Sequence, residues 1–246
     1  MVWVMSGPSG FGEFWPDGKP EGTDDRSHDG WRMRLTAHYA SQTTEGKRHL
    51  FDVDPIVGQN QYAFFVGEKF NFEIGTEGRI VNSVLTPVKP HEPPSYYRVH
   101  RTPSSIGSLI SLSLCSLAVD QRLKEIIESL EPGVHDFFPI ELRMSQKKTY
   151  PLQYYTLVVG QYIDSFSPKN TEKRALLQWK GHNLYNYENS KKGMTGLAFC
   201  KHKFKSAHLW RERRFTKPLY CLSDELLSKI DETGLRIPKH YKAREV

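Results

Sequence analysis

Four side chains near the C-terminus are of the types that bind zinc. Cys200, His202, His208 and Cys221 offer two thiols and two imidazoles, a ligand set that zinc accepts. Their spacing matches no common structural zinc site, and a strand places the side chains of a C-x-H pair on one face without any metal. We therefore expect buried thiols and surface histidines, with no bound metal and no cofactor.

The nearest approach to an acid–base pair is Asp52 and Asp54, in the segment LFDVDP. Any D-x-D on a strand shares one face, and general acid–base catalysis needs a further partner placed near the reacting proton. The sequence contains no GxSxG elbow, no GxxxxGK[ST] phosphate loop, no HExxH motif and no dinucleotide fingerprint. We therefore expect a protein that is not an enzyme and has no small-molecule substrate.

The stretch from Lys191 to Lys217 interleaves basic and aromatic residues. Such a composition neutralises phosphates and stacks on bases, so nucleic-acid binding is one interpretation. The alternation in AFCKHKF is also typical of a strand with one packed face and one solvated face. We favour a solvated face or a protein interface, and nucleic-acid binding is the alternative.

Charge is distributed unevenly along the 246 residues, whose net charge is +6. Residues 1–139 hold 13 Lys and Arg against 18 Asp and Glu, a net charge of −5, whereas residues 140–218 hold 16 against 5, a net charge of +11. Such a polarised surface steers a charged partner. It does not by itself indicate nucleic acid.

The sequence patterns around these residues predict an α+β fold with a mixed, mostly antiparallel sheet and a few helices. We expect an irregular N-terminal arm at residues 1–30, a β-rich region at residues 31–99 and an α+β region at residues 100–246. The arm is rich in Gly, Pro, Asp and Ser. From Trp31 the alternation in WRMRLTAHY, followed by QYAFFV, KFNFEI and GRIVNSVL, predicts short strands.

The C-terminal region contains the clearest local patterns. Asp120 is suited to cap a helix whose apolar residues recur at intervals of three and four and which ends near Pro132 and Gly133. Ser223 is suited to cap a second helix, which ends before Gly234. The apolar segment at residues 150–163 predicts a central strand. The order of strand, capped helix, glycine and strand thus occurs twice, and we favour chance over duplication.

Composition also predicts a compartment. The apolar run at residues 106–119 is too short to cross a bilayer of about 30 Å, and the N-terminus lacks the pattern of a secretory signal. Cys115, Cys200 and Cys221 are odd in number and irregularly spaced, which favours reduced thiols. We expect a cytoplasmic protein that does not enter a membrane.

An ordered set of weak motifs in the C-terminal half resembles a known family. The motifs are Ala118–Ile127, Gly133–Leu142, Tyr154–Val159, Asp164-Ser165, His208–Arg211, Leu219–Leu226 and Gly234-Leu235. Over roughly residues 95–240 the sequence is similar to the Myxococcus-type immunity proteins of polymorphic toxin systems. It departs from them at Asp120, where the family has serine, at the Arg-Ile-Pro that follows Leu235, and in the basic insert around residues 191–205.

The resemblance implies an immunity protein that binds and neutralises a cognate secreted toxin in the cytoplasm. It further implies a nuclease toxin delivered by a type VI or contact-dependent system, bound in a complex of 1:1 or higher stoichiometry.

Two sets of residues are candidates for the toxin contact. Arginine and tryptophan are enriched where substitution by alanine weakens binding most, which selects Trp179, Trp210, Arg211, Arg213 and Arg214. Trp210 has a second interpretation as a core residue, because it belongs to one of the family-like motifs. The alternative contact is acidic and consists of Asp52, Asp54, Glu68, Glu73 and Glu77.

Overall fold

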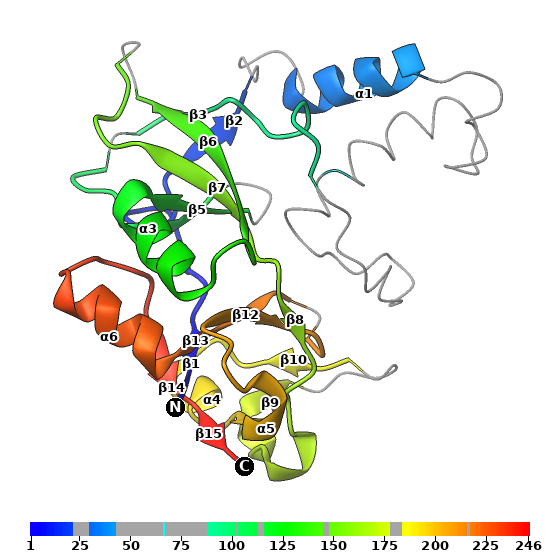
Figure 1. Ribbon diagram of the computed structural model, residues 1–246, viewed down its shortest axis with the longest axis vertical. Coiled ribbons are helices and arrows are strands. Elements are labelled where there is room, and N and C mark those ends of the chain that lie inside the picture. Colours follow the sequence, from blue (N-terminus) through cyan, green and yellow to red (C-terminus); the bar gives the residue numbers. More distant parts are fainter. Residues whose placement is uncertain are drawn as a thin grey trace.

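The computed structural model is an α+β protein with two main sheets, one above the other along the long axis of the molecule (Figure 1). The predicted fold class is therefore confirmed. The residues that the structure describes are 1–21, 30–42, 66, 88–101, 103–112, 116–144, 148–177, 184–215 and 217–246.

The upper sheet has six strands, and each neighbouring pair is antiparallel except β3 and β6. In spatial order its strands are β2 (Gly18–Pro20), β3 (Tyr96–Val99), β6 (Asp136–Arg143), β7 (Tyr154–Val158), β5 (Leu117–Asp120) and β4 (Leu109–Ser111). The prediction of a central, buried strand within residues 150–163 is confirmed by β7, which lies between β6 and β5. The last two residues of that segment leave this sheet and join the other one.

The lower sheet has five strands and contains a correction to the predicted N-terminal arm. In spatial order its strands are β14 (His240–Lys242), β1 (Val2–Met5), β13 (Leu219–Ser223), β12 (Leu209–Glu212) and β8 (Tyr162–Ile163). Residues 1–30 were expected to be irregular, but β1 pairs with both β13 and β14 and its Val2 and Val4 are fully buried. Strand β2 also lies within residues 1–30, so this segment contributes a strand to each sheet, although the residues after Met5 are rich in Gly and Pro.

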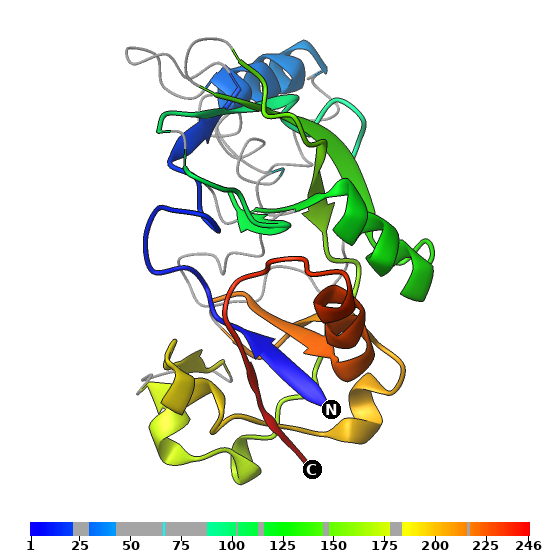
Figure 2. The same ribbon diagram turned by 90° about the vertical axis from the view of Figure 1, so that its left-hand side faces the viewer.

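Helices α3 (Gln121–Leu130) and α6 (Asp224–Glu232) pack against each other on the same side of the molecule (Figure 2). The predicted caps are confirmed. The carboxylate of Asp120 accepts a hydrogen bond from the N–H of Leu123 at 2.8 Å, and the Ser223 hydroxyl accepts one from the N–H of Leu226 at 3.1 Å. Each helix is followed by a glycine with positive φ, at Gly133 and Gly234. The two helices contribute apolar side chains to the core between the sheets.

Glu131 follows α3 and ties the two halves of the molecule together. Its carboxylate accepts hydrogen bonds from the His135 ring at 2.8 Å and from the backbone N–H groups of His208 and Leu209 at 2.7 and 2.9 Å. Burial opposes its ionisation, but the hydrogen bonds from His135 and His208 outweigh burial and lower the pKa of Glu131. The start of β12 is thereby fixed to the end of α3.

The segment that begins at Trp31 differs from the prediction. Its alternation indicated a strand, and this was wrong, because residues 30–42 form helix α1 (Gly30–Gln42). Trp31 and Leu35 are one helical turn apart and both buried, and the Trp31 indole N–H donates to the carbonyl of Glu92 at 2.7 Å. Apart from Val66, the predicted strands QYAFFV, KFNFEI and GRIVNSVL lie outside the described residues.

Short elements surround the lower sheet (Figure 1). They are η4 (Pro168–Asn170), η5 (Lys173–Ala175), β9 (Leu176–Leu177), β10 (Asn186–Tyr187), α4 (Lys191–Met194), β11 (Ala198–Phe199), α5 (Lys201–Phe204) and β15 (Arg244–Glu245). Within the described ranges, no helix is both long and apolar enough to span a bilayer.

Candidate protein-binding surface

Strand β12 buries two of the predicted contact residues. The Trp210 ring is fully buried and stacks on Phe204, with 4.9 Å between the ring centroids. Arg211 is only 4% exposed, and its guanidinium donates to the Tyr162 hydroxyl at 2.8 Å. The core interpretation therefore describes Trp210, and both side chains contribute to packing inside the lower sheet.

The turn after β12 brings two other predicted residues closer to solvent. Arg213 and Arg214 are half-buried. The Arg214 side chain lies 3.9 Å from the Asp164 carboxylate and 5.3 Å from the centre of the Tyr185 ring. Lys217, later in the same turn, is exposed. We call Arg213, Arg214 and Lys217 the basic turn.

Glu212 holds the start of the basic turn in place. It is 2% exposed, and its carboxylate accepts hydrogen bonds from the backbone N–H and hydroxyl of Ser165, at 3.0 and 2.6 Å. The backbone N–H groups of Arg213 and Arg214 donate to its other oxygen, at 2.9 and 3.4 Å. Burial dominates these hydrogen bonds and raises the pKa of Glu212 to about 7.

The remaining predicted contact residues lie outside the described residues. They are Trp179, Asp52, Asp54, Glu68, Glu73 and Glu77. The structure therefore does not relate them to the basic turn.

The four potential zinc ligands are not gathered into one site. Among the described residues, no group of three or more His, Cys, Asp and Glu side chains is arranged to hold a metal. Cys221 is buried inside β13, where burial raises the pKa of its thiol, and the His208 ring instead contacts the Ser223 hydroxyl at 2.9 Å. The predicted strand AFCKHKF is wrong, because β11 ends at Phe199 and α5 begins at Lys201. Phe204, the last residue of α5, stacks on Trp210.

Exposed lysines and arginines cover the short elements around the lower sheet. They are Lys169, Lys173, Arg174, Lys191, Lys192, Lys201, Lys203 and Lys205. Ion pairs link Lys201 to Glu245 and Lys203 to Asp164, at 3.9 and 3.8 Å, but exposed pairs of this length are weak. This surface therefore has a positive character, as the charge distribution of the sequence predicts.

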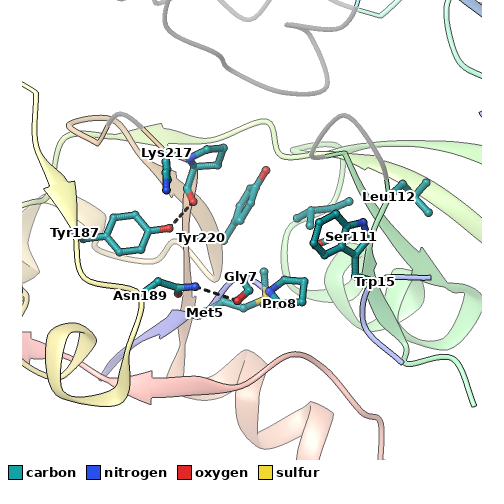
Figure 3. A pocket seen from close by; sticks show the side chains of 12 residues that line it. Met5, Gly7, Pro8, Trp15, Ser111, Leu112, Tyr187, Asn189, Lys217 and Tyr220 are labelled. Carbon is teal, nitrogen blue, oxygen red and sulfur yellow. Dashed lines mark hydrogen bonds between the residues drawn. The ribbon is translucent and has the colours of Figure 1, made fainter. Parts of the chain in front are cut away.

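An open cavity of about 330 Å³ lies beside the basic turn, between the two sheets (Figure 3). The described residues that line it come from four distant segments of the chain and are Met5, Gly7, Pro8, Trp15, Ser111, Leu112, Leu117, Tyr187, Asn189, Lys217, Pro218 and Tyr220. Met5, Leu117 and Tyr220 also belong to the core between the sheets, so the cavity is an opening onto that core. No sequence motif marks it, because its wall forms only when the sheets come together.

These features define an α+β protein with a positively charged surface and an apolar cavity at the edge of its core. The model of the Immunity protein family (Imm11) matches residues 34–243, and the chain belongs to this family. The resemblance seen in the sequence is confirmed and extends further toward the N-terminus. A search of curated proteins found no match.

Proposed function

We propose that the protein neutralises a cognate secreted toxin by binding the toxin domain in the cytoplasm. The family match over residues 34–243 carries this proposal. An inhibitor of this kind acts by occupying its target, so it needs a complementary surface and no catalytic group. We accordingly propose that the protein has no turnover of its own.

The finer features of the proposal concern the toxin and the compartment. We propose a nuclease toxin delivered by a type VI or contact-dependent system, as the sequence resemblance implies. The unpaired thiols of Cys200 and Cys221 support a reducing compartment. A nuclease presents a basic cleft to its substrate, so a basic surface of its inhibitor is suited to an acidic face away from that cleft.

The basic turn is the proposed contact among the described residues. The Arg213 side chain has no ion-pair partner among them, and Lys217 extends into solvent. Both charges are therefore available to a carboxylate of a partner. Trp210 and Arg211 are buried and support this surface from within.

The test is complex formation with the cognate toxin domain, which we expect to be encoded beside this protein, purified in a catalytically inactivated form. We expect a discrete complex by size-exclusion chromatography with light scattering. The double substitution Arg213→Glu and Lys217→Glu should weaken binding by about tenfold or more, and by less at high salt, because the attraction is electrostatic. The control is Lys191→Glu with Lys192→Glu, which reverses two exposed charges on α4.

Three results would count against parts of this proposal. A double variant of the basic turn that binds as tightly as wild type would remove the contact from this turn. Loss of binding in Asp52, Asp54 and Glu68 charge reversals would move it to the acidic residues. The nucleic-acid alternative would be favoured if no complex forms and the protein instead binds DNA or RNA. The logarithm of that association constant should then fall linearly with the logarithm of the salt concentration.

A further inference from the structure

We propose that the cavity between the two sheets accepts one large apolar side chain of the toxin, and that a carboxylate next to that side chain binds Lys217. This inference rests on the proposed function and names the chemistry that the toxin presents. It places a buried anchor beside the electrostatic contact at the basic turn.

The cavity has room for a large side chain, and its walls are mostly apolar. Its volume of about 330 Å³ is at the lower end of the range for small-molecule sites, roughly 300–1,000 Å³. Met5, Trp15, Leu112, Leu117 and Tyr220 provide apolar surface on its walls (Figure 3). An aromatic or large aliphatic side chain inserted there loses contact with water on the sides that face the walls, as the anchors of protein interfaces do.

The charge at the cavity determines which sign of charge the ligand should carry. Among the described residues that line it, Lys217 is the one that carries a charge, and none of them is a carboxylate. Lys217 is exposed, so its ammonium group reaches a carboxylate at the mouth without being desolvated. The cavity therefore favours an apolar group joined to an anion over one joined to a cation.

Two hydrogen bonds hold part of the cavity wall in place. Asn189 donates a side-chain hydrogen bond to the carbonyl of Gly7 at 3.1 Å, and the Tyr187 hydroxyl donates to the carbonyl of Pro218 at 3.0 Å (Figure 3). These bonds connect Gly7, which follows β1, and Pro218, which follows the basic turn, to the segment around β10. This part of the wall therefore needs little ordering on binding, which lowers the entropic cost.

Gly7 allows the cavity to be filled without disturbing the core. A Cβ built at Gly7 meets only the side-chain nitrogen of Asn189, at the ordinary contact distance of 3.9 Å. The substitution Gly7→Trp therefore places a bulky ring at the cavity. Gly10→Trp is the matched control, because a Cβ there has no neighbour within 4 Å and Gly10 does not line the cavity.

The first experiment uses a small probe, so that it does not depend on the toxin. 3-Phenylpropionate combines a phenyl ring with a carboxylate, and 2-phenylethylammonium has a similar ring and chain with the opposite charge. In NMR titrations we expect saturable binding of 3-phenylpropionate with a Kd in the low millimolar range, as befits so small a ligand. Binding should be lost in Gly7→Trp, retained in Gly10→Trp and weakened about fivefold or more in Lys217→Glu.

Two outcomes would overturn the inference at this stage. One is unchanged binding of 3-phenylpropionate in a folded Gly7→Trp variant, and the other is equal or tighter binding of 2-phenylethylammonium. If Gly7→Trp does not fold, Asn189→Phe, at an exposed lining position, replaces it and should likewise abolish binding.

The second experiment repeats the comparison with the inactivated toxin domain. We expect Gly7→Trp to weaken the complex at least tenfold and Gly10→Trp to leave its affinity unchanged. If wild type binds the toxin and Gly7→Trp binds equally well, the cavity is not the anchor site but the proposed function stands. If wild type does not bind the toxin, the proposed function fails, whatever the small probe shows.

Discussion

Glu212 should make the stability of this protein fall as the pH rises from 5 to 8. Its side chain is 2% exposed, and burial raises its pKa from the ordinary value of 4.5 to about 7. A carboxyl whose pKa is higher in the folded state binds its proton more tightly there. The resulting stabilisation is complete below pH 4.5 and is lost as the pH rises through 7.

The expected magnitude follows from the pKa values of this carboxyl in the folded and unfolded chains. Each tenfold difference in proton affinity between the two states corresponds to about 1.4 kcal/mol, so the free energy of unfolding should lose about 2–3 kcal/mol between pH 5 and pH 8 through this group alone. The Glu212→Gln variant does not titrate. Its amide nitrogen must face the N–H groups of either Ser165 or Arg213, which costs about 1–3 kcal/mol at every pH.

Urea unfolding of wild type and Glu212→Gln at half-unit steps of pH isolates the effect. The free energy of unfolding of wild type minus that of the variant should fall by about 2–3 kcal/mol from pH 5 to pH 8. Glu225→Gln, which removes an exposed carboxyl, is the control for loss of one negative charge. A difference between wild type and Glu212→Gln that stays constant within about 0.5 kcal/mol would refute a raised pKa at Glu212.

Five further substitutions test the fold by urea unfolding. Asp120→Ala and Ser223→Ala should each cost about 0.5–2 kcal/mol, because each removes a helix cap, and equal stability to wild type would contradict this. Gly133→Ala and Gly234→Ala should each cost about 1–2 kcal/mol from backbone strain alone, because φ is positive and a Cβ has no neighbour within 4 Å at either position; a gain in stability would show that the turns relax. Glu131→Ala should cost at least about 3 kcal/mol, because it leaves buried donors from both halves of the molecule without their acceptor, and a loss below about 1 kcal/mol would show that water replaces the carboxylate.

The sequence predicts those parts of the fold that local chemistry determines. The caps at Asp120 and Ser223 and the helices that follow them depend on residues within a few positions, and both were predicted correctly. Strand β7 was predicted from its own apolar composition.

Elements that depend on distant partners were not predicted. Strand β1 is only four residues long and becomes a strand by pairing with β13 and β14, more than two hundred residues away. The alternation at Trp31 was misleading because the same segment also places Trp31 and Leu35 on one helical face.

The predicted contact residues illustrate a similar limit. Composition alone does not distinguish an arginine on the surface from one held inside a sheet, and Arg211 is buried by its contact with Tyr162 from β8. All four residues of β12 are buried, so the alternation rule for a half-exposed strand does not apply there. The cavity draws on four segments and has no signal in any one of them.

The central claim, that this protein neutralises a toxin by binding it, is tested most directly in cells. The measurement is the survival of bacteria that express the proposed cognate toxin domain, with and without the protein itself. Co-expression of wild type should restore growth, and the Arg213→Glu and Lys217→Glu variant, present at the same level, should protect less. Cells that die at the same rate with and without the wild-type protein would contradict the claim.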